Sequence, residues 1–281
     1  MDRLLAYLWT PFQRAVAEAD SSDADEIIGQ SRLSKHLAPG TVLIHESPMR
    51  RVVLEPNNTV VKAGRHLVLA EADAIKVASD AGLPAPRLHS LSTNEHRVVE
   101  IRMDYIPGQS LDKLWPTMST DEKKSVASQL REIIEQMRAM EPPPNYIGCC
   151  GGTGIRETTV HSRDEGPVCK DETEFNNYLV SSLFKQIPTV LRTSFRNHLR
   201  TDHRIVFSHG DLTPRNIMMQ DGKISGVVDW EDAGWYPEYW ELIKFIERPA
   251  VGDWKEYAEV IFSTLYPTEL VTYAGMSKWR F

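Results

Sequence analysis

The sequence predicts an α+β protein with a small part that mixes strands with a helix and a larger part that is mainly helical. Short alternating apolar runs, separated by turns, begin at Thr41 and indicate strands. Beyond Leu111, apolar residues recur at helical spacing. We therefore expect a helical extension over residues 1–40, a small lobe over 41–106 and a larger lobe over 107–281.

Four strands and one helix are expected in the small lobe. The strands cover residues 41–45, 51–54, 59–62 and 97–103, and the helix covers 67–81. The Glu-Pro-Asn-Asn sequence at 55–58 indicates a turn between two of the strands. Gly82 and Pro84 follow the helical run and indicate where the helix ends.

The larger lobe begins with a helix that has a clear start signal. Ser119 and Glu122 have the spacing of a capping box, and an apolar stripe follows them up to Met137. Further helices are expected over 172–184 and 187–199, after an irregular excursion over 146–170. Three short apolar runs then follow, at 205–208, 216–219 and 224–229, with an Asp-Gly turn between the last two.

Composition excludes several classes of protein. The chain has 41% hydrophobic and 25% charged residues and a net charge of −7, without a Lys/Arg stripe that would neutralise a nucleic acid backbone. The apolar stretch near the N-terminus is too short for a signal peptide or a membrane span. Three cysteines, Cys149, Cys150 and Cys169, lack C-x-x-C spacing. We expect a cytoplasmic protein that binds neither nucleic acid nor membrane.

The strongest chemical signal is the segment from Ser208 to Asn216, together with Asp229 after a hairpin. Transfer of a γ-phosphoryl group to a hydroxyl needs one carboxylate to orient the nucleophile and accept its proton. It also needs oxygen ligands that hold Mg²⁺ against the phosphates. Asp211, Asn216 and Asp229 provide these groups, and a loop closed by Gly210 directs the first two toward one cavity.

A nucleotide kinase also needs a cation for the phosphates and a carboxylate that positions the cation. Lys62 ends an expected strand, and Glu71 lies on the helix that follows it. The two residues therefore occur in the order that this chemistry requires. An exposed acidic helix face is the alternative explanation for Glu71.

Several segments together resemble one known family. The sequences VVKAG, AEADAI, RMDYIPGQSLDKLW, HGDLTPRNIMM and VVDWEDAG are similar to those of the aminoglycoside phosphotransferase and choline-kinase-like family. The resemblance covers roughly residues 41–245. The segment PEYWE at 237–241 resembles the fungal-type branch of that family. A bilobal protein-kinase-like fold is implied, with a small mixed β-sheet/helix N-lobe that binds nucleotide and a larger, mainly helical C-lobe for catalysis and acceptor binding.

The resemblance also implies roles for individual residues. Asp211 is expected to be the catalytic aspartate, and Asn216 and Asp229 are expected to bind Mg²⁺. Lys62 would contact the phosphates of ATP with Glu71 as its ion-pair partner. Other implied contributions are a structural role for His209, which would brace its loop, and a hinge at Asp104 and Ile106 whose backbone groups would bond adenine.

One feature departs from protein kinases, because no G-x-G-x-x-G precedes Lys62. In its place the segment 46–52 resembles the Ser-Pro nucleotide loop of some antibiotic kinases. Ser47 and Met49 are therefore the expected phosphate-contacting residues of this loop. The implied activity is an ATP-dependent and Mg²⁺-dependent phosphotransfer to the hydroxyl of a small molecule, such as an antibiotic, an amino alcohol or a specialised metabolite.

The sequence leaves several alternatives open. Aromatic residues behind Asp229 form either a wall for a cationic or planar substrate or part of the core; they are Trp230, Trp235, Tyr236, Tyr239 and Trp240. Acidic residues in the same segment either attract an amine or form a solvated surface; they are Glu231, Asp232, Glu238 and Glu241. Arg215 either neutralises transferred charge or points outward, and it is left out of the predicted site.

Other functions also remain possible. A protein kinase is disfavoured, because only seven residues separate Asp229 from Pro237, too few for an activation segment. A kinase-like binding module without transfer activity is a second alternative. A kinase fold that performs other metabolite chemistry is a third. The oligomeric state and the acceptor are not encoded in any recognised motif.

Overall fold

The computed structural model describes residues 37–47, 50–64, 67–94, 98–158 and 163–280. These residues form two compact units that are treated separately below. One unit contains the described residues up to Leu67 together with Ser90–Arg102, and the other contains Val68–His89 and the chain from Met103 onward. Most of the predicted extension over 1–40 lies outside the described residues, and the lobe boundaries at 41, 106 and 107 stay predictions.

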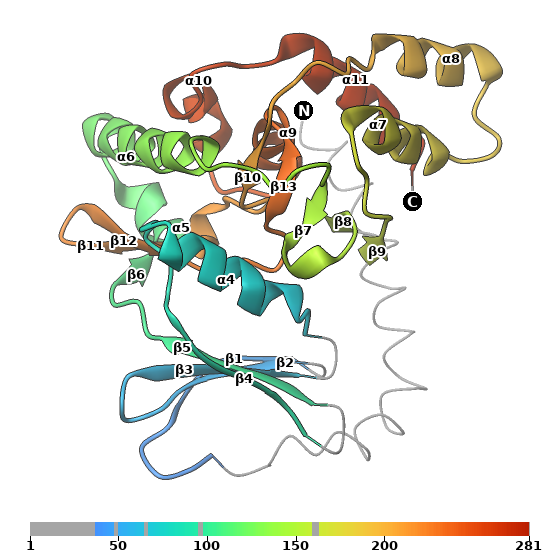
Figure 1. Cartoon of the computed structure of the whole chain (residues 1–281). Coiled ribbons are helices and arrows are strands. Elements are labelled where there is room, and N and C mark those ends of the chain that lie inside the picture. The colour runs from blue at the N-terminus through green and yellow to red at the C-terminus, as the bar shows by residue number, and fades with distance from the viewer. Residues whose placement is uncertain (1–36, 48–49, 65–66, 95–97, 159–162, 281) are drawn as a thin grey trace, which may run out of the picture. The chain divides into compact units, whose positions relative to one another are not determined.

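The first unit is built on a five-stranded sheet with the order β1-β2-β3-β5-β4 (Figure 1). Its strands are β1 (Val42–Ser47), β2 (Arg50–Leu54), β3 (Thr59–Gly64), β4 (Leu88–Thr93) and β5 (Val99–Asp104). The strands β1, β2 and β3 are antiparallel neighbours, as the alternating apolar runs predict. The expected turn before β3 is closed by Asn57, whose Oδ1 accepts the Thr59 N–H at 3.2 Å. β4 was not predicted, because its residues are mostly exposed and lack apolar alternation.

The second unit contains all the helices of the described chain. They are α4 (Ala70–Asp80), α5 (Leu111–Leu114), α6 (Thr120–Arg138), α7 (Glu172–Ser181), α8 (Thr189–His198), α9 (Trp240–Glu247), α10 (Ala258–Ile261) and α11 (Pro267–Ser277). Short 3-10 helices cover Trp115–Thr117, Cys150–Gly152, Pro214–Asn216 and Trp254–Tyr257. No helix among the described residues is long and apolar enough to cross a membrane.

Three small sheets complete the second unit. One has the order β10 (Ile205–Ser208), β13 (Gly234–Pro237) and β7 (Gly148–Cys149). The next has the order β12 (Lys223–Val227), β11 (Ile217–Gln220) and β6 (Gln109–Ser110), and β8 (Arg156–Thr158) pairs with β9 (Arg163–Glu165). The mixture of antiparallel sheets and helices confirms the predicted α+β class. The excursion over 146–170 is more ordered than expected, because it contains β7, β8 and β9.

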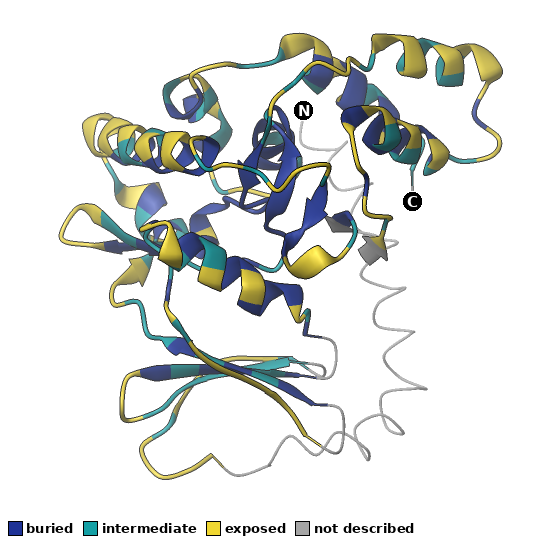
Figure 2. Ribbon diagram, in the orientation of Figure 1, coloured by how far each residue is buried: buried dark blue, intermediate teal, exposed yellow. Residues whose placement is uncertain are grey.

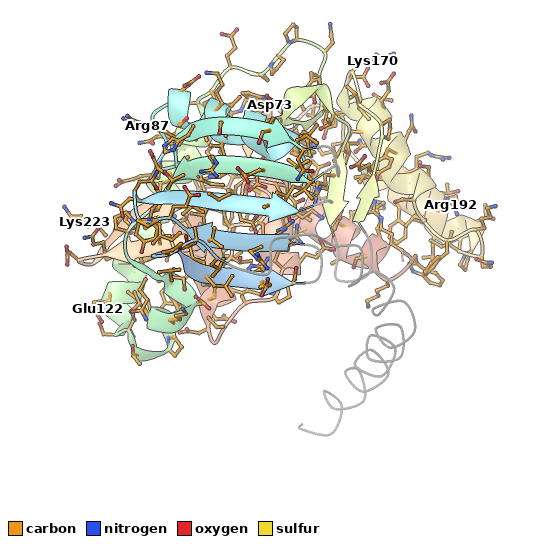
Figure 3. The ribbon with its side chains drawn as sticks, turned by 90° about the horizontal axis from the view of Figure 1, so that it is seen from below. Asp73, Arg87, Glu122, Lys170, Arg192 and Lys223 are labelled. Atoms are coloured by element: carbon orange, nitrogen blue, oxygen red, sulfur yellow. The ribbon has the colours of Figure 1, made fainter. Side chains whose placement is uncertain are left out.

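Sequence signals explain how the helices begin and how they are held. The capping box of α6 is present: the Glu122 N–H donates to Ser119 Oγ at 3.3 Å, and the Ser119 N–H donates to Glu122 Oε2 at 2.7 Å. α8 has no fully buried residue, and Arg192 links it to the last turn of α7 and to the chain just after that helix. Arg192 is labelled in Figure 3. Its guanidinium donates to the carbonyl oxygens of Val180 at 2.9 Å and Phe184 at 2.7 Å.

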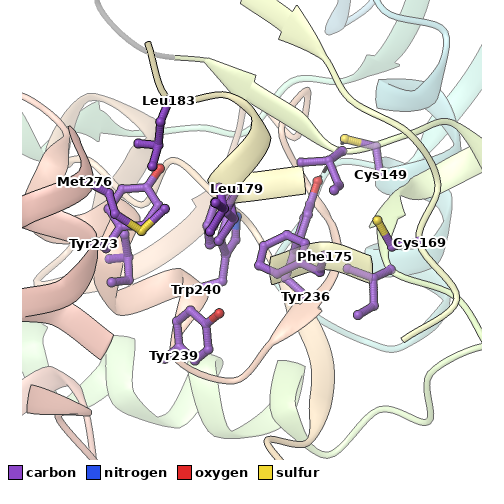
Figure 4. Packing of buried hydrophobic residues seen from close by; sticks show 14 of the residues in the cluster. Cys149, Cys169, Phe175, Leu179, Leu183, Tyr236, Tyr239, Trp240, Tyr273 and Met276 are labelled. Atoms are coloured by element: carbon purple, nitrogen blue, oxygen red, sulfur yellow. Dashed lines mark hydrogen bonds between the residues drawn. The ribbon is translucent and has the colours of Figure 1, made fainter. Parts of the chain in front are cut away.

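The core of the second unit is aromatic around α7, α9 and α11. Trp240 stacks with Tyr236 and meets Phe175 edge to face, and Tyr273 contacts the same indole ring (Figure 4). Figure 2 shows β13 and most of β10 buried beneath these elements. All five aromatic residues behind Asp229 are buried. They are therefore core residues, which rules out the alternative of an exposed wall for a substrate.

Candidate active site

The site is built around the Asp211 loop, which we define as residues 208–216 in the second unit. Strand β10 delivers the chain to His209, and Gly210 turns it with a φ of 77°. A Cβ at Gly210 would lie 2.9 Å from the backbone oxygen of Asp232, so only glycine fits this close approach. The turn then closes on the short helix Pro214–Asn216. This arrangement points Asp211 and Asn216 to the same side, as the sequence predicts.

His209 joins the Asp211 loop to the segment that carries Asp229. Its Nδ1 accepts the Asp211 N–H at 3.1 Å, and its Nε2 lies 3.2 Å from the carbonyl oxygen of Val228. Since Nδ1 is an acceptor here, the neutral ring carries its proton on Nε2 and donates it to Val228. The ring is fully buried and packs edge to face on Trp230. His209 therefore braces the loop, the role that the family resemblance implies.

Asp211 and Asn216 are in direct contact. The Asn216 Nδ2 donates to both the backbone oxygen and Oδ2 of Asp211, each at 3.0 Å. Both side chains are buried. Since Nδ2 donates both of these bonds, Asn216 Oδ1 is the atom of the side chain that suits a cation.

Arg215 also reaches Asp211, with its Nη2 2.6 Å from Oδ2. Burial lowers the pKa of Arg215, but the neighbouring carboxylates of Asp211, Asp229 and Glu231 outweigh this effect and the pKa lies above its usual value. The side chain remains 56% exposed. Arg215 is thus a partner of the predicted catalytic aspartate, although it was left out of the predicted site.

Asp229 lies beside this pair and gathers further carboxylates. The Val228 N–H donates to the Asn216 oxygen at 2.9 Å, so Asp229 follows directly after the contact. Its φ of 66° is in the left-handed region, which few residues other than glycine occupy. One carboxylate oxygen each from Asp229, Glu71 and Glu231 lies within 4.8 Å of the others. Three like charges at this separation favour a bound cation.

This donor set fits Mg²⁺. The ion prefers hard oxygen ligands from one or two carboxylates and completes its shell with water or phosphate. Asn216 Oδ1 and the Asp229 carboxylate would offer such ligands, and they come from neighbouring backbone segments joined by a hydrogen bond. Glu71 lies at the first turn of α4 and belongs to the same unit.

The remaining predicted nucleotide residues are distributed over both units. Lys62 is buried on β3, in register with Val52 of β2. It belongs to the first unit and Glu71 to the second, so their ion pair stays a prediction. Ser47 ends β1, and its Oγ donates to the Arg50 oxygen at 3.3 Å across the hairpin. Met49 lies outside the described residues.

The predicted hinge at Asp104 and Ile106 is anchored within the second unit. The Asp104 N–H donates to the Arg87 oxygen at 3.0 Å, so this N–H is not available to adenine. Its carboxylate meets His89 Nε2 at 2.6 Å. Ile106 packs on Gly226 of β12, where a Cβ would lie only 2.6 Å from Ile106 Cγ2.

Buried charged residues contact the Asp211 loop on its interior side, and the sequence analysis did not predict these contacts. Glu241, in the first turn of α9, accepts the N–H groups of His209 at 2.6 Å and Gly210 at 3.0 Å through Oε2. Burial raises the pKa of Glu241, and the contacts with His209 and Gly210 offset this only in part. Arg248, directly after α9, donates to Asp232 Oδ2 at 2.5 Å.

These contacts answer part of the question left open for the acidic segment, whether its carboxylates form a solvated surface. Asp232 also accepts a bond from Arg156 Nε at 2.8 Å, and Glu238 pairs with Arg204 at 2.9 Å. Asp232 and Glu241 are buried, which excludes a solvated surface for both residues. No sequence signal identified Arg156 or Arg248, because each is an isolated arginine far along the chain from its partner.

Comparison with known proteins agrees with the family resemblance of the sequence. A sequence profile of the phosphotransferase enzyme family matches residues 30–269. An aminoglycoside 3′-phosphotransferase from Enterococcus faecalis is 32% identical over 68 residues, which is 24% of this chain and 25% of that protein. The chain thus matches about a quarter of the length of this curated relative.

Solved structures share the fold. An aminoglycoside 3′-phosphotransferase of type VIII superposes with a TM-score of 0.57 at 15% identity, covering 86% of this chain and 94% of that chain. A ternary complex of APH(2″)-IIa with streptomycin and ATP gives a TM-score of 0.55 at 11% identity, covering 91% and 86%. At this identity the likeness concerns the fold alone, and it confirms the kinase-like fold that the sequence resemblance implied.

Proposed function

We propose that this chain, which belongs to the phosphotransferase enzyme family, is an ATP-dependent kinase that phosphorylates a hydroxyl of a small molecule. One observation carries the proposal: Asp211, which accepts two bonds from Asn216, lies next to the segment that supplies Asp229. A base and two oxygen ligands within one buried loop system are what phosphoryl transfer to an alcohol requires.

In this proposal the residues have separate tasks. Asp211 orients the acceptor hydroxyl and takes its proton as the oxygen attacks the γ-phosphorus. The bond from that phosphorus to the bridging oxygen breaks, and ADP leaves with the bridging oxygen. Asn216 and Asp229 hold Mg²⁺, which supplies positive charge against the phosphates when it is bound. Arg215, already in contact with Asp211, adds positive charge at the rim.

The nucleotide contacts are also part of the proposal. Lys62 contacts the phosphates with Glu71 as its carboxylate partner, and Ser47 and Met49 contribute to the phosphate loop. The hinge binds adenine through the Ile106 N–H and the Asp104 carbonyl. The small lobe would then bind nucleotide, and the larger lobe would carry catalysis and the acceptor.

The acceptor is proposed to be a small molecule in the cytoplasm. A folded protein would need a docking segment between Asp229 and Pro237, and β13 already fills half of that stretch. The structures of relatives contain streptomycin, or hygromycin B in a complex of APH(4)-Ia. An antibiotic, an amino alcohol or a specialised metabolite is accordingly the proposed acceptor class. Assignment to the fungal-type branch stays a prediction.

An ATP-consumption screen tests the proposal. Wild-type protein with Mg²⁺ is assayed against aminoglycosides, amino alcohols, sugars and fungal metabolites, with Asp211→Asn as the matched control. We expect turnover with at least one acceptor and a loss of about 10²–10⁴-fold in kcat in the variant. Nucleotide binding, measured by calorimetry, should persist in the variant because Asn216 and Asp229 are unchanged.

Two results would contradict the proposal. Full activity in Asp211→Asn would reject the assignment of the base. Nucleotide binding by the wild type without ATP consumption against the whole panel would instead favour the alternative, a kinase-like binding module.

A further inference from the structure

Arg248 reaches the Asp211 loop from the far end of α9. Its Nη2 donates to Asp232 Oδ2 at 2.5 Å and lies 3.4 Å from the Gly210 oxygen, while its Nε lies 3.6 Å from Asp211 Oδ1. The side chain is buried, with 10% of its surface exposed. One planar guanidinium thus contacts three oxygens, two through Nη2 and one through Nε. Lysine, with a single compact ammonium, does not span such a set.

The contact between Arg248 and Asp211 joins a buried guanidinium nitrogen to a buried carboxylate oxygen. Asp211 Oδ1 and Arg248 Nε are each shielded from solvent, and neither forms a hydrogen bond within the described part of the chain. A buried charge without an opposite charge is strongly unfavourable. The attraction across 3.6 Å therefore balances this side of the Asp211 carboxylate, while Arg215 and Asn216 hold its Oδ2.

The position of Arg248 is itself fixed from both sides. Its partner Asp232 is held by Arg156, at 2.8 Å from the second carboxylate oxygen. The Arg248 N–H continues α9 by donating to the Lys244 oxygen at 2.9 Å. The opposite end of α9 supplies Glu241, which accepts the His209 and Gly210 N–H groups. Residues at the two ends of α9, Glu241 and Arg248, therefore both contact residues 209–211 of the Asp211 loop.

We infer that Arg248 is a positioning residue for the phosphoryl-transfer reaction, which fixes the carboxylate plane of Asp211 through Oδ1. This inference rests on the proposed function. Without Arg248 the Asp211 carboxylate is held through Oδ2 alone, so its Oδ1 can turn away from the reactive position. A reacting group displaced by about 1 Å can lose about 10²-fold in rate. The binding of ATP does not depend on this orientation, so the effect falls on kcat.

The first test is a steady-state comparison of Arg248→Lys with a matched variant, Arg138→Lys. Arg138 is also a buried arginine of the second unit, but it bonds to the Glu238 oxygen at 3.0 Å and to Ser263 Oγ at 3.4 Å, away from Asp211. We expect Arg248→Lys to lower kcat by about 10-fold to 100-fold with KM for ATP within about threefold. Arg138→Lys should retain kcat within about threefold. In Arg248→Ala, millimolar guanidinium should restore part of kcat.

The second test does not depend on activity. The unfolding midpoints of Arg248→Lys, Asp211→Asn and the double variant form a cycle. We expect the shift in the double variant to be smaller than the sum of the single shifts, because the first change already breaks the contact.

The outcomes separate the two proposals. Wild-type kcat in a folded Arg248→Lys protein, an equal loss in Arg138→Lys, or additive midpoint shifts would each overturn the inference. If the wild type consumes no ATP with any acceptor, the proposed function fails, and the unfolding cycle still decides whether Arg248 and Asp211 are coupled.

Discussion

The Asp211 loop and the β1–β2 hairpin are both assigned to phosphate chemistry, yet they are constructed differently. In the loop, His209, Asp211 and Asn216 are buried. His209 and Asn216 bond to Val228 of the neighbouring segment, and Asp211 bonds to Arg215 and Asn216 within the loop. In the hairpin, β1 is an edge strand that is exposed from Val42 to Glu46, and the Ser47 hydroxyl donates to the Arg50 oxygen.

The two regions differ in whether folding alone fixes the positions of their side chains. The loop is held by α9 and by buried charges, so folding itself sets the positions of its side chains. Strand β1 of the hairpin is mostly exposed, so we expect the nucleotide rather than packing to set the position of Ser47. Substitutions behind the loop should therefore have large effects, and substitutions in the hairpin should have small ones.

Glu241→Ala should have the largest effect. It removes the acceptor of two buried N–H groups, and each unsatisfied donor costs roughly 1–3 kcal/mol. We expect a loss of about 2–5 kcal/mol in the free energy of unfolding, measured by urea denaturation. Glu238→Ala is the control, because its partner Arg204 is 66% exposed and a surface pair contributes about 1 kcal/mol or less. Equal losses in the two variants would contradict the buried role of Glu241.

Gly210→Ala should come next. The left-handed φ of 77° disfavours alanine by roughly 1–2 kcal/mol, and the new Cβ meets the Asp232 oxygen at 2.9 Å. Gly222→Ala is matched, with a φ of 74° and no atom within 4 Å. We expect Gly210→Ala to be the more destabilising of the two in urea denaturation and to lower kcat as well. Indistinguishable unfolding curves would show that the close approach to Asp232 has no energetic weight.

Glu241→Gln should have a smaller effect than Glu241→Ala, because glutamine still offers an acceptor oxygen. The variant removes the titration of the carboxyl group, so its effect is measured as a function of pH. Burial raises the pKa of Glu241 in the folded protein. A carboxyl group with a raised folded-state pKa contributes stability below its unfolded-state pKa, and this stability is lost as the pH rises through the folded-state pKa. The melting temperature of the wild type should therefore fall relative to Glu241→Gln as the pH is raised from mildly acidic to neutral. A difference that is constant with pH would contradict the assigned direction.

Ser47→Ala should have the smallest effect. The hydroxyl makes one local bond of 3.3 Å at a partly exposed turn, so its loss should leave the melting temperature nearly unchanged. We expect kcat to be retained and KM for ATP to rise by less than about threefold. A loss of kcat comparable to that in Gly210→Ala would show that the hairpin is as important to catalysis as the loop.

Local patterns in the sequence were sufficient for much of the fold and for the central residues of the site. Alternation and turn residues located β2 and β3, and the capping box located the start of α6. The spacing of Asp211, Asn216 and Asp229 indicated one site, because a short loop and a hairpin cannot separate them far. The order of the expected strand and helix indicated Lys62 and Glu71, and the ion pair between them stays a prediction.

The identity of the groups behind the loop was decided only by the tertiary structure. Arg156 meets Asp232 across 76 positions of sequence, and Glu241 meets His209 across 32. No local periodicity encodes such partners, because a buried charge is satisfied by whichever opposite group the packing of distant elements brings near. The sequence alone therefore determined which residues are suited to the chemistry, and packing determined which buried charges hold them in place.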